Sequence, residues 1–120
     1  MASPYAVVLV AVPDKKVAQK LAHDLVEKKL AACVNIVPGV ESHYRWQEKI
    51  EKAQELMLLV KTRAALIPEL TTYVRENHPY TVPEVVSLRI EAGNPAYLHW
   101  VGAGTIFAPP EKEEERSRKP

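Results

Sequence analysis

The residues best suited to bind a metal ion lie in a short stretch that contains two prolines. His78 precedes Pro79, and Glu84 follows Pro83, so an imidazole and a carboxylate flank a stiff loop. Copper and zinc both accept nitrogen and oxygen ligands of this kind. The alternative is structural, because a histidine at the end of a helix can hydrogen-bond the last carbonyl groups and suits the helix dipole. A tight metal site would need a third ligand, which another chain could supply.

The remaining metal-ligand and nucleophile candidates are scattered along the chain. Cys33 is the single cysteine, which excludes an internal disulfide and a cysteine-rich zinc site. Its apolar neighbours favour a small buried hydrophobe, because a reactive thiolate needs a nearby cation or helix N-terminus. His23 falls on the polar face of a predicted helix, where we expect it to be solvated. His43 lies on a predicted hairpin, and His99 is expected to be partly exposed beside Trp100.

Length and composition restrict the class of protein. The chain has 120 residues, 47% of them hydrophobic, and a net charge of +1, which is typical of one soluble domain. The near-neutral charge disfavours nucleic-acid binding. No apolar run approaches the ~20 residues of a membrane-spanning helix, and no leader pattern opens the chain, so we expect a cytoplasmic location.

The sequence also lacks the motifs of common enzymes. We find no glycine-rich phosphate loop, no His-Glu-x-x-His and no Gly-x-Ser-x-Gly. A hydrolase that used His78 and Glu84 as acid and base is therefore the least favoured alternative. We expect that the protein is not an enzyme.

Hydrophobic periodicity predicts a β-α-β-β-α-β order with one further helix. The first segment is an unbroken apolar run, expected to lie in the middle of a sheet. The first helix is amphipathic, with Val17, Leu21 and Leu25 on its apolar face. Right-handed crossovers make this order an α+β ferredoxin-like sandwich, with two helices on one face of an antiparallel sheet. The expected elements are strand 5–12, helix 15–30, strand 31–46, strand 50–62, helix 64–77, strand 84–91 and a short helix from Pro95.

The predicted hairpin of strands 31–46 and 50–62 is unusually long, since typical strands have about 5 to 6 residues. Pro38-Gly39 interrupts the first strand, which implies a bulge, bend or edge. Tyr44 and Trp46 lie on its far half, where large aromatic side chains would be exposed in a monomer. Such patches usually mark interfaces, so we expect self-association through the hairpins and the last helix.

The chain divides into a folded domain over residues 1–107 and a tail over residues 108–120. The tail begins with two prolines and continues with charges of both signs, without apolar periodicity. This composition predicts disorder.

Several motifs, spread over about residues 5–105, resemble the CutA divalent-cation tolerance family. They are Leu30-Ala31-Ala32-Cys33-Val34-Asn35-Ile36-Val37-Pro38-Gly39, Ser42-x-Tyr44-x-Trp46, Glu55, Val60-Lys61-Thr62, His78-Pro79-Tyr80-x-x-Pro83-Glu84 and Tyr97-Leu98-x-Trp100-Val101. The resemblance implies a non-enzymatic homotrimer whose hairpins pair between subunits and leave clefts at the subunit boundaries. The family is linked to tolerance of copper and other divalent cations, and copper binding is attributed to some members.

The resemblance also implies a set of site residues. The metal-ligand candidates are His78, Glu84 and Cys33, with Cu²⁺ or another divalent cation as the ligand and no organic cofactor. Some members carry a cysteine near the end of the first strand, proposed as a copper ligand; Val10 stands at about that place here, so this soft ligand is missing. The other cleft candidates are Asn35, Tyr44, Trp46, Glu55, Lys61, Tyr80 and Trp100.

A second function is compatible with the same resemblance. The family is similar in architecture to PII signal-transduction proteins, and mammalian members are linked to acetylcholinesterase anchoring. The clefts could then bind a small anionic ligand or a partner protein. Lys61, Tyr44 and Trp46 suit an anion or a ring better than a metal, so this regulatory or scaffold role stays open beside the metal-binding role.

Overall fold

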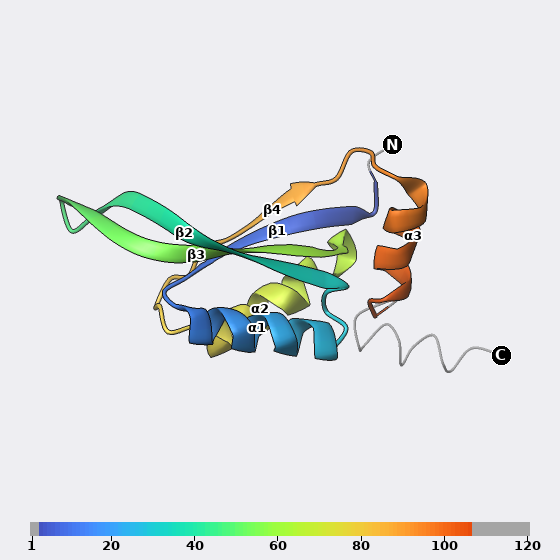
Figure 1. The fold of residues 1–120 in the computed structure, drawn as a ribbon, viewed down its shortest axis with the longest axis horizontal. Helices are drawn as coiled ribbons and strands as arrows, with labels where there is room; N and C mark the ends of the chain where they lie inside the picture. The colour runs from blue at the N-terminus through green and yellow to red at the C-terminus, as the bar shows by residue number, and fades with distance from the viewer. Residues whose placement is uncertain (1–2, 107–120) are drawn as a thin grey trace.

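Four strands form one antiparallel sheet in the order β2-β3-β1-β4 in the computed structural model, which describes residues 3–106 (Figure 1). This architecture confirms the predicted α+β fold, its long hairpin and its C-terminal helix. The expected tail over residues 108–120 and the domain boundary at 107 lie outside the described residues. The elements are β1 (Tyr5–Val12), α1 (Lys15–Glu27), β2 (Cys33–Trp46), β3 (Lys49–Arg63), the 3-10 turn η1 (Ala64–Leu66), α2 (Ile67–Asn77), β4 (Val85–Arg89) and α3 (Pro95–Ala103).

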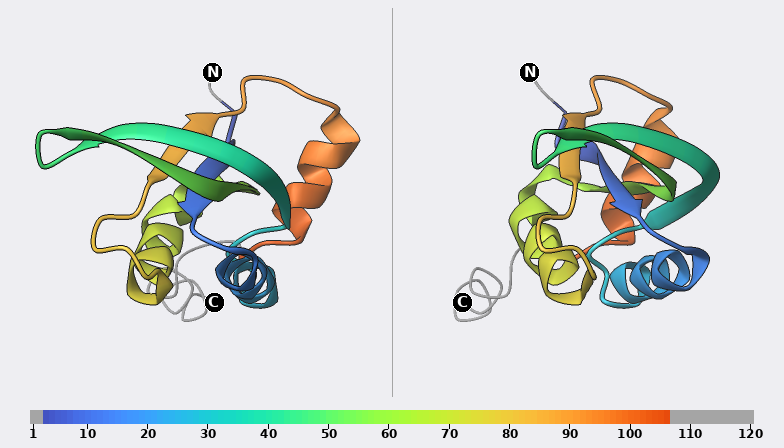
Figure 2. Two further views of the ribbon diagram at one scale, coloured as in Figure 1. Left: turned by 60° about the vertical axis from the view of Figure 1, so that its left-hand side comes forward. Right: turned by 90° about the vertical axis from the view of Figure 1, so that its left-hand side faces the viewer.

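The hydrophobic core lies between the sheet and the helices α1 and α2, which lie side by side against one face (Figure 2). Val8 and Val10 of β1 point into it, and Leu21 and Leu25 of α1 cover them, as their spacing predicts. Val17 of the same predicted stripe is only half-buried. Burial of this kind contributes roughly 1.5–3 kcal/mol for each large apolar side chain.

Helix α1 is shorter than the range 15–30 that its pattern predicts. Asp14 caps its start by accepting a hydrogen bond from the Val17 amide at 2.9 Å. The helix ends at Glu27 because Lys29 adopts a left-handed conformation, with φ of 60°. The Leu30 and Ala31 amides then both donate to the Leu25 carbonyl, which turns the chain toward β2.

The opposite face of the sheet carries apolar side chains that neither α1 nor α2 covers. β1 is central, as predicted, but its odd-numbered residues Val7 and Leu9 are only half-buried in the single chain. Their β4 partners are more exposed, with Leu88 at 56% opposite Val7 and Val86 at 48% opposite Leu9. We call this surface the open face; its apolar members are Val7, Leu9, Val37, Met57, Leu59, Val86 and Leu88.

The β2-β3 hairpin extends well beyond the two helices (Figure 1). Its register shifts between Val37 and Val40, which confirms the predicted irregularity at Pro38-Gly39. Before the bulge, odd-numbered residues of β2 lie opposite odd-numbered residues of β3. After it, even-numbered residues of β2 take that place, so they lie on the same face as the odd-numbered β3 residues. Tyr44 and Trp46 therefore lie on the continuation of the open face. The tip is a two-residue turn in which Gln47 and Glu48 both have positive φ.

Helix α3 is held at the end of the sheet away from the hairpin tip (Figure 1). Arg63, at the end of β3, donates to the Gly102 carbonyl at 2.8 Å and to the Thr105 hydroxyl at 3.1 Å. Gly102 leaves room for this contact, because a Cβ atom there would lie 2.8 Å from the Tyr5 hydroxyl and would force a side chain to shift.

Candidate functional site

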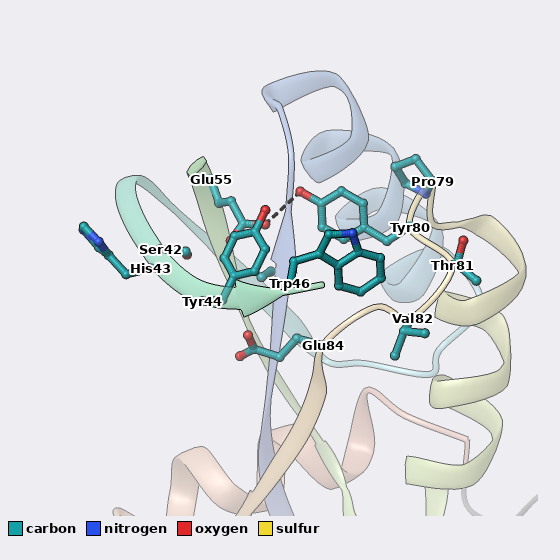
Figure 3. A pocket seen from close by; sticks show the side chains of 11 residues that line it. Ser42, His43, Tyr44, Trp46, Glu55, Pro79, Tyr80, Thr81, Val82 and Glu84 are labelled. Carbon is teal, nitrogen blue, oxygen red and sulfur yellow. Dashed lines mark hydrogen bonds between the residues drawn. The ribbon is translucent and has the colours of Figure 1, made fainter. Parts of the chain in front are cut away.

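A pocket of about 690 Å³ lies between the hairpin and the loop 78–84 (Figure 3). The hairpin supplies one wall and the loop that follows α2 supplies the other. Five of the predicted site residues meet here, namely Tyr44, Trp46, Glu55, Tyr80 and Glu84. The full lining is Ala11, Ser42, His43, Tyr44, Trp46, Glu55, Pro79, Tyr80, Thr81, Val82 and Glu84.

His78 lies beneath this pocket and holds its loop in place. The buried ring contacts the Ala11 carbonyl through Nε2 at 2.7 Å, and its Nδ1 accepts the Tyr80 amide at 3.1 Å. A carbonyl can only accept and an amide can only donate, so the ring is neutral with its proton on Nε2. Both ring nitrogens are thus engaged, and neither offers a lone pair to a metal in this arrangement.

His78 does not act as the helix cap that was the structural alternative in the sequence analysis. The ring does not bond the last carbonyls of its own helix, because its acceptor is Ala11 in β1, 67 residues earlier. At the end of α2, the Asn77 side chain donates instead to the Tyr73 carbonyl at 2.9 Å. His78 therefore links the loop to the central strand of the sheet.

Tyr80 and Glu55 are joined across the pocket. The tyrosine hydroxyl donates to a Glu55 carboxylate oxygen at 2.8 Å, and Glu55 itself is buried (Figure 3). Burial, followed by the hydrogen bond and charge of Glu55, raises the pKa of Tyr80 to about 12. Tyr80 is thus neutral and a donor at physiological pH, and it fixes the position of the carboxylate.

This bond predicts a stability change that appears at high pH. Because the folded-state pKa of Tyr80 is raised, its stabilising contribution is present below the unfolded value of about 10 and is lost as pH rises toward and through 12. We expect Tyr80→Phe to cost about 1 kcal/mol at neutral pH and to reduce the further loss at high pH. Urea unfolding at several pH values measures both effects.

The matched control is Tyr44→Phe, which removes a hydroxyl from the same pocket without breaking the Tyr80–Glu55 bond. A Tyr80→Phe protein that lost as much stability as wild type between neutral and high pH would contradict this assignment.

Cys33, Asn35, Lys61 and Trp100 lie away from this pocket. Cys33 lies opposite Lys61 in the β2-β3 strand pairing, at the α3 end of the hairpin. The Lys61 ammonium contacts the Asn35 side-chain oxygen. Lys61 lies six positions after Glu55 along β3, a distance of about 20 Å on a strand. In one chain, therefore, Cys33 does not join His78 and Glu84, and Lys61 does not join the aromatic residues of the pocket.

The α3 end has its own aromatic pair. Tyr97 and Trp100 stack with ring centroids 5.7 Å apart. Burial, together with the neighbouring Cys33 thiol, raises the pKa of Tyr97. Cys33 is only partly buried, unlike the small buried hydrophobe expected from its neighbours, and it is not among the residues that line the pocket.

One group of potential metal ligands escaped the sequence analysis. His23, Asp24 and Glu27 on α1 place their ligand atoms within 4.8 Å of one another, the one such group of three or more found in residues 3–106. Their His-Asp-x-x-Glu spacing was the available signal, because residues three and four positions apart converge on one face of a helix.

Asp24 in that group already has two partners. It accepts hydrogen bonds from Lys20 at 2.8 Å and from Tyr73 at 2.6 Å, and these bonds lower its pKa. His23 and Glu27 are exposed on α1, which confirms the exposure predicted for His23, whereas Asp24 is only partly exposed and faces Tyr73 of α2. The group is therefore an ordinary surface cluster unless a metal displaces these partners.

Comparison with known proteins identifies the class to which this fold and site belong. Residues 6–104 match the model of the CutA1 divalent ion tolerance protein family. A divalent-cation tolerance protein CutA from Thermus thermophilus is 54% identical over 99 residues, which are 82% of this chain and 96% of that protein. A solved structure of a divalent cation tolerance protein from Thermus thermophilus has a TM-score of 0.84 and 52% identity, and the match covers 85% of this chain and 99% of that one.

The chain belongs to the CutA1 divalent ion tolerance protein family. Relatives from animals and plants are longer, and the chain spans 52% of a mouse Protein CutA that is 51% identical over 92 residues. Among residues 3–106, no helix has the length and apolar character needed to cross a membrane. None of the names of these relatives describes a catalysed reaction.

Proposed function

We propose that this chain acts as a homotrimer in the response to divalent cations, with copper(II) as the first ion to test. Family membership supports the cation, and three copies is the number that the resemblance implies. The observation that carries the assembly is the open face, where Leu88 is 56% exposed in the single chain. Monomeric proteins rarely expose a contiguous apolar surface that crosses a whole sheet.

The sheet edges give a second reason for assembly. β2 is an edge strand of 14 residues, and most of its length lies in a hairpin that the helices do not cover. An unprotected long edge favours pairing with another chain. Tyr44 and Trp46 on the same hairpin are of the types enriched at the centres of interfaces.

The metal ligands predicted from the sequence do not fit a metal within one chain. Both His78 nitrogens are hydrogen-bonded, Glu55 accepts from Tyr80, and Cys33 is at the far end of the hairpin. Glu84 remains an exposed carboxylate at the mouth of the pocket. A divalent cation at Glu84 would therefore need further ligands from a second copy.

Calorimetric titration of chelator-treated protein with copper(II) and zinc(II) tests this proposal. We expect stoichiometric binding that Glu84→Gln abolishes and that Glu27→Gln, in the α1 surface group, leaves unchanged. Because both substitutions remove one exposed carboxylate, they differ mainly in location. Binding that only Glu27→Gln removes would move the site to α1, and no binding by wild type would refute direct metal binding.

A further inference from the structure

His23, Asp24 and Glu27 bring one nitrogen ligand and two carboxylate ligands together on a single helix. Their ligand atoms all lie within 4.8 Å of one another. His23 Nε2 and Glu27 Oε1 are 3.6 Å apart. Two ligands of a tetrahedral zinc ion with metal–ligand bonds of ~2.0 Å lie ~3.3 Å apart. Because residues four positions apart share one face of a helix, small side-chain rotations complete this geometry.

Asp24 keeps one oxygen available for a metal, although it already has two partners. Lys20 and Tyr73 both donate to the same atom, Oδ2, at 2.8 Å and 2.6 Å. Among residues 3–106, Oδ1 has no hydrogen-bond donor. Hydrogen bonds from neighbouring residues commonly orient the carboxylates that ligate metals. Tyr73 therefore fixes the position of the Asp24 carboxylate from α2 and leaves Oδ1 to coordinate a cation.

The Lys20 ammonium opposes a cation at this position, because it lies 2.8 Å from the Asp24 carboxylate. The Lys20 side chain is 62% exposed, so it can move into water without disturbing the helix. An exposed ion pair between residues four positions apart contributes little to stability. A divalent cation carries twice the charge of the ammonium and contacts three ligand atoms, so it can displace Lys20.

We propose that His23, Asp24 and Glu27 bind a zinc(II) ion, with water in the fourth position. The imidazole nitrogen favours zinc over magnesium and calcium, which prefer oxygen ligands alone. Helix α1 lies on the opposite side of the sheet from the open face, so the proposed trimer does not need to cover this group (Figure 2). Because His23 and Glu27 are exposed and Lys20 competes, the site fills only after the stoichiometric site at Glu84. It needs no ligand from a second copy and does not depend on the proposed function.

Calorimetric titration of the Glu84→Gln protein with zinc(II) tests this proposal apart from the cation site at Glu84. We expect one weak, saturable step per chain, and no such step with magnesium(II). In the same background, His23→Ala is expected to raise the zinc(II) Kd by about tenfold or more, because even the loss of an outer-shell partner has an effect of that size. His43→Ala is the matched control, since His43 Nε2 also lies beside a carboxylate, 2.7 Å from a Glu41 oxygen, and we expect no change in Kd.

Two further variants distinguish a defined site from a general attraction of zinc(II) to carboxylates. Lys20→Gln removes the competing ammonium and is expected to lower the zinc(II) Kd about threefold. Tyr73→Phe removes the bond that orients Asp24 and is expected to raise the Kd about tenfold, with an unchanged circular dichroism spectrum. The absence of a saturable zinc(II) step, equal binding of magnesium(II), or an unchanged Kd in His23→Ala or Lys20→Gln would each overturn the proposal.

Discussion

Leu88→Glu is expected to convert the proposed homotrimer into monomers. Leu88 belongs to β4 on the open face, opposite Val7, and is 56% exposed in the single chain. A carboxylate there remains in water in a monomer, so the fold of one chain should tolerate it. In an assembly that covers the open face, the same charge would be buried without a partner, at a cost of several kcal/mol per copy.

Sedimentation velocity of the variant, with circular dichroism as a check on folding, measures this effect. Ser87→Glu is the matched control, because Ser87 is also exposed but pairs with Val8 and so points to the other face of β4. We expect the control to keep the mass of wild type. A Leu88→Glu protein that also kept that mass would show that the open face is not the interface.

His78→Ala is expected to be the most destabilising of the single substitutions considered for the pocket. It removes the donor to the Ala11 carbonyl and the acceptor of the Tyr80 amide, and it leaves space beneath the loop. Two backbone groups lose their partners, so we expect a loss of about 2–3 kcal/mol in the free energy of unfolding. Urea unfolding at neutral pH gives this quantity.

His99→Ala provides the comparison, because His99 is exposed on α3 and its removal should change stability by no more than about 0.5 kcal/mol. Similar values for the two variants would mean that the His78 hydrogen bonds are not structural. A large loss of stability in His78→Ala would also displace the loop, and reduced metal binding in that variant could then follow from the displaced loop alone. Glu84→Gln is therefore the better variant for testing metal binding.

Local patterns predicted most of the fold. The apolar run of β1 and the four-residue spacing of Leu21 and Leu25 depend on neighbours in the chain, and both predictions are confirmed. The Asp14 cap is equally local. The end of α1 was placed three residues too late, because the left-handed turn at Lys29 is not visible in a pattern of apolar residues.

The site was less predictable because it depends on distant pairings. The partner of His78 is 67 residues away, so the sequence could indicate a stiff loop but not the acceptor of its imidazole. The bulge after Val37 was expected, yet its effect on which face Trp46 occupies depends on the register with β3. Motif resemblance placed Cys33 and Glu84 in one candidate set. In a single chain, however, Cys33 lies at the α3 end of β2, whereas Glu84 lines the pocket beside the far half of the hairpin.

Sedimentation equilibrium of the wild-type protein over a wide concentration range tests the central claim, which is that the open face is covered by identical copies. We predict a single species of three chain masses that persists on dilution, because apolar area of this extent favours tight association. A species of one chain mass at all concentrations would contradict the proposed assembly and, with it, a cation site completed by a second copy.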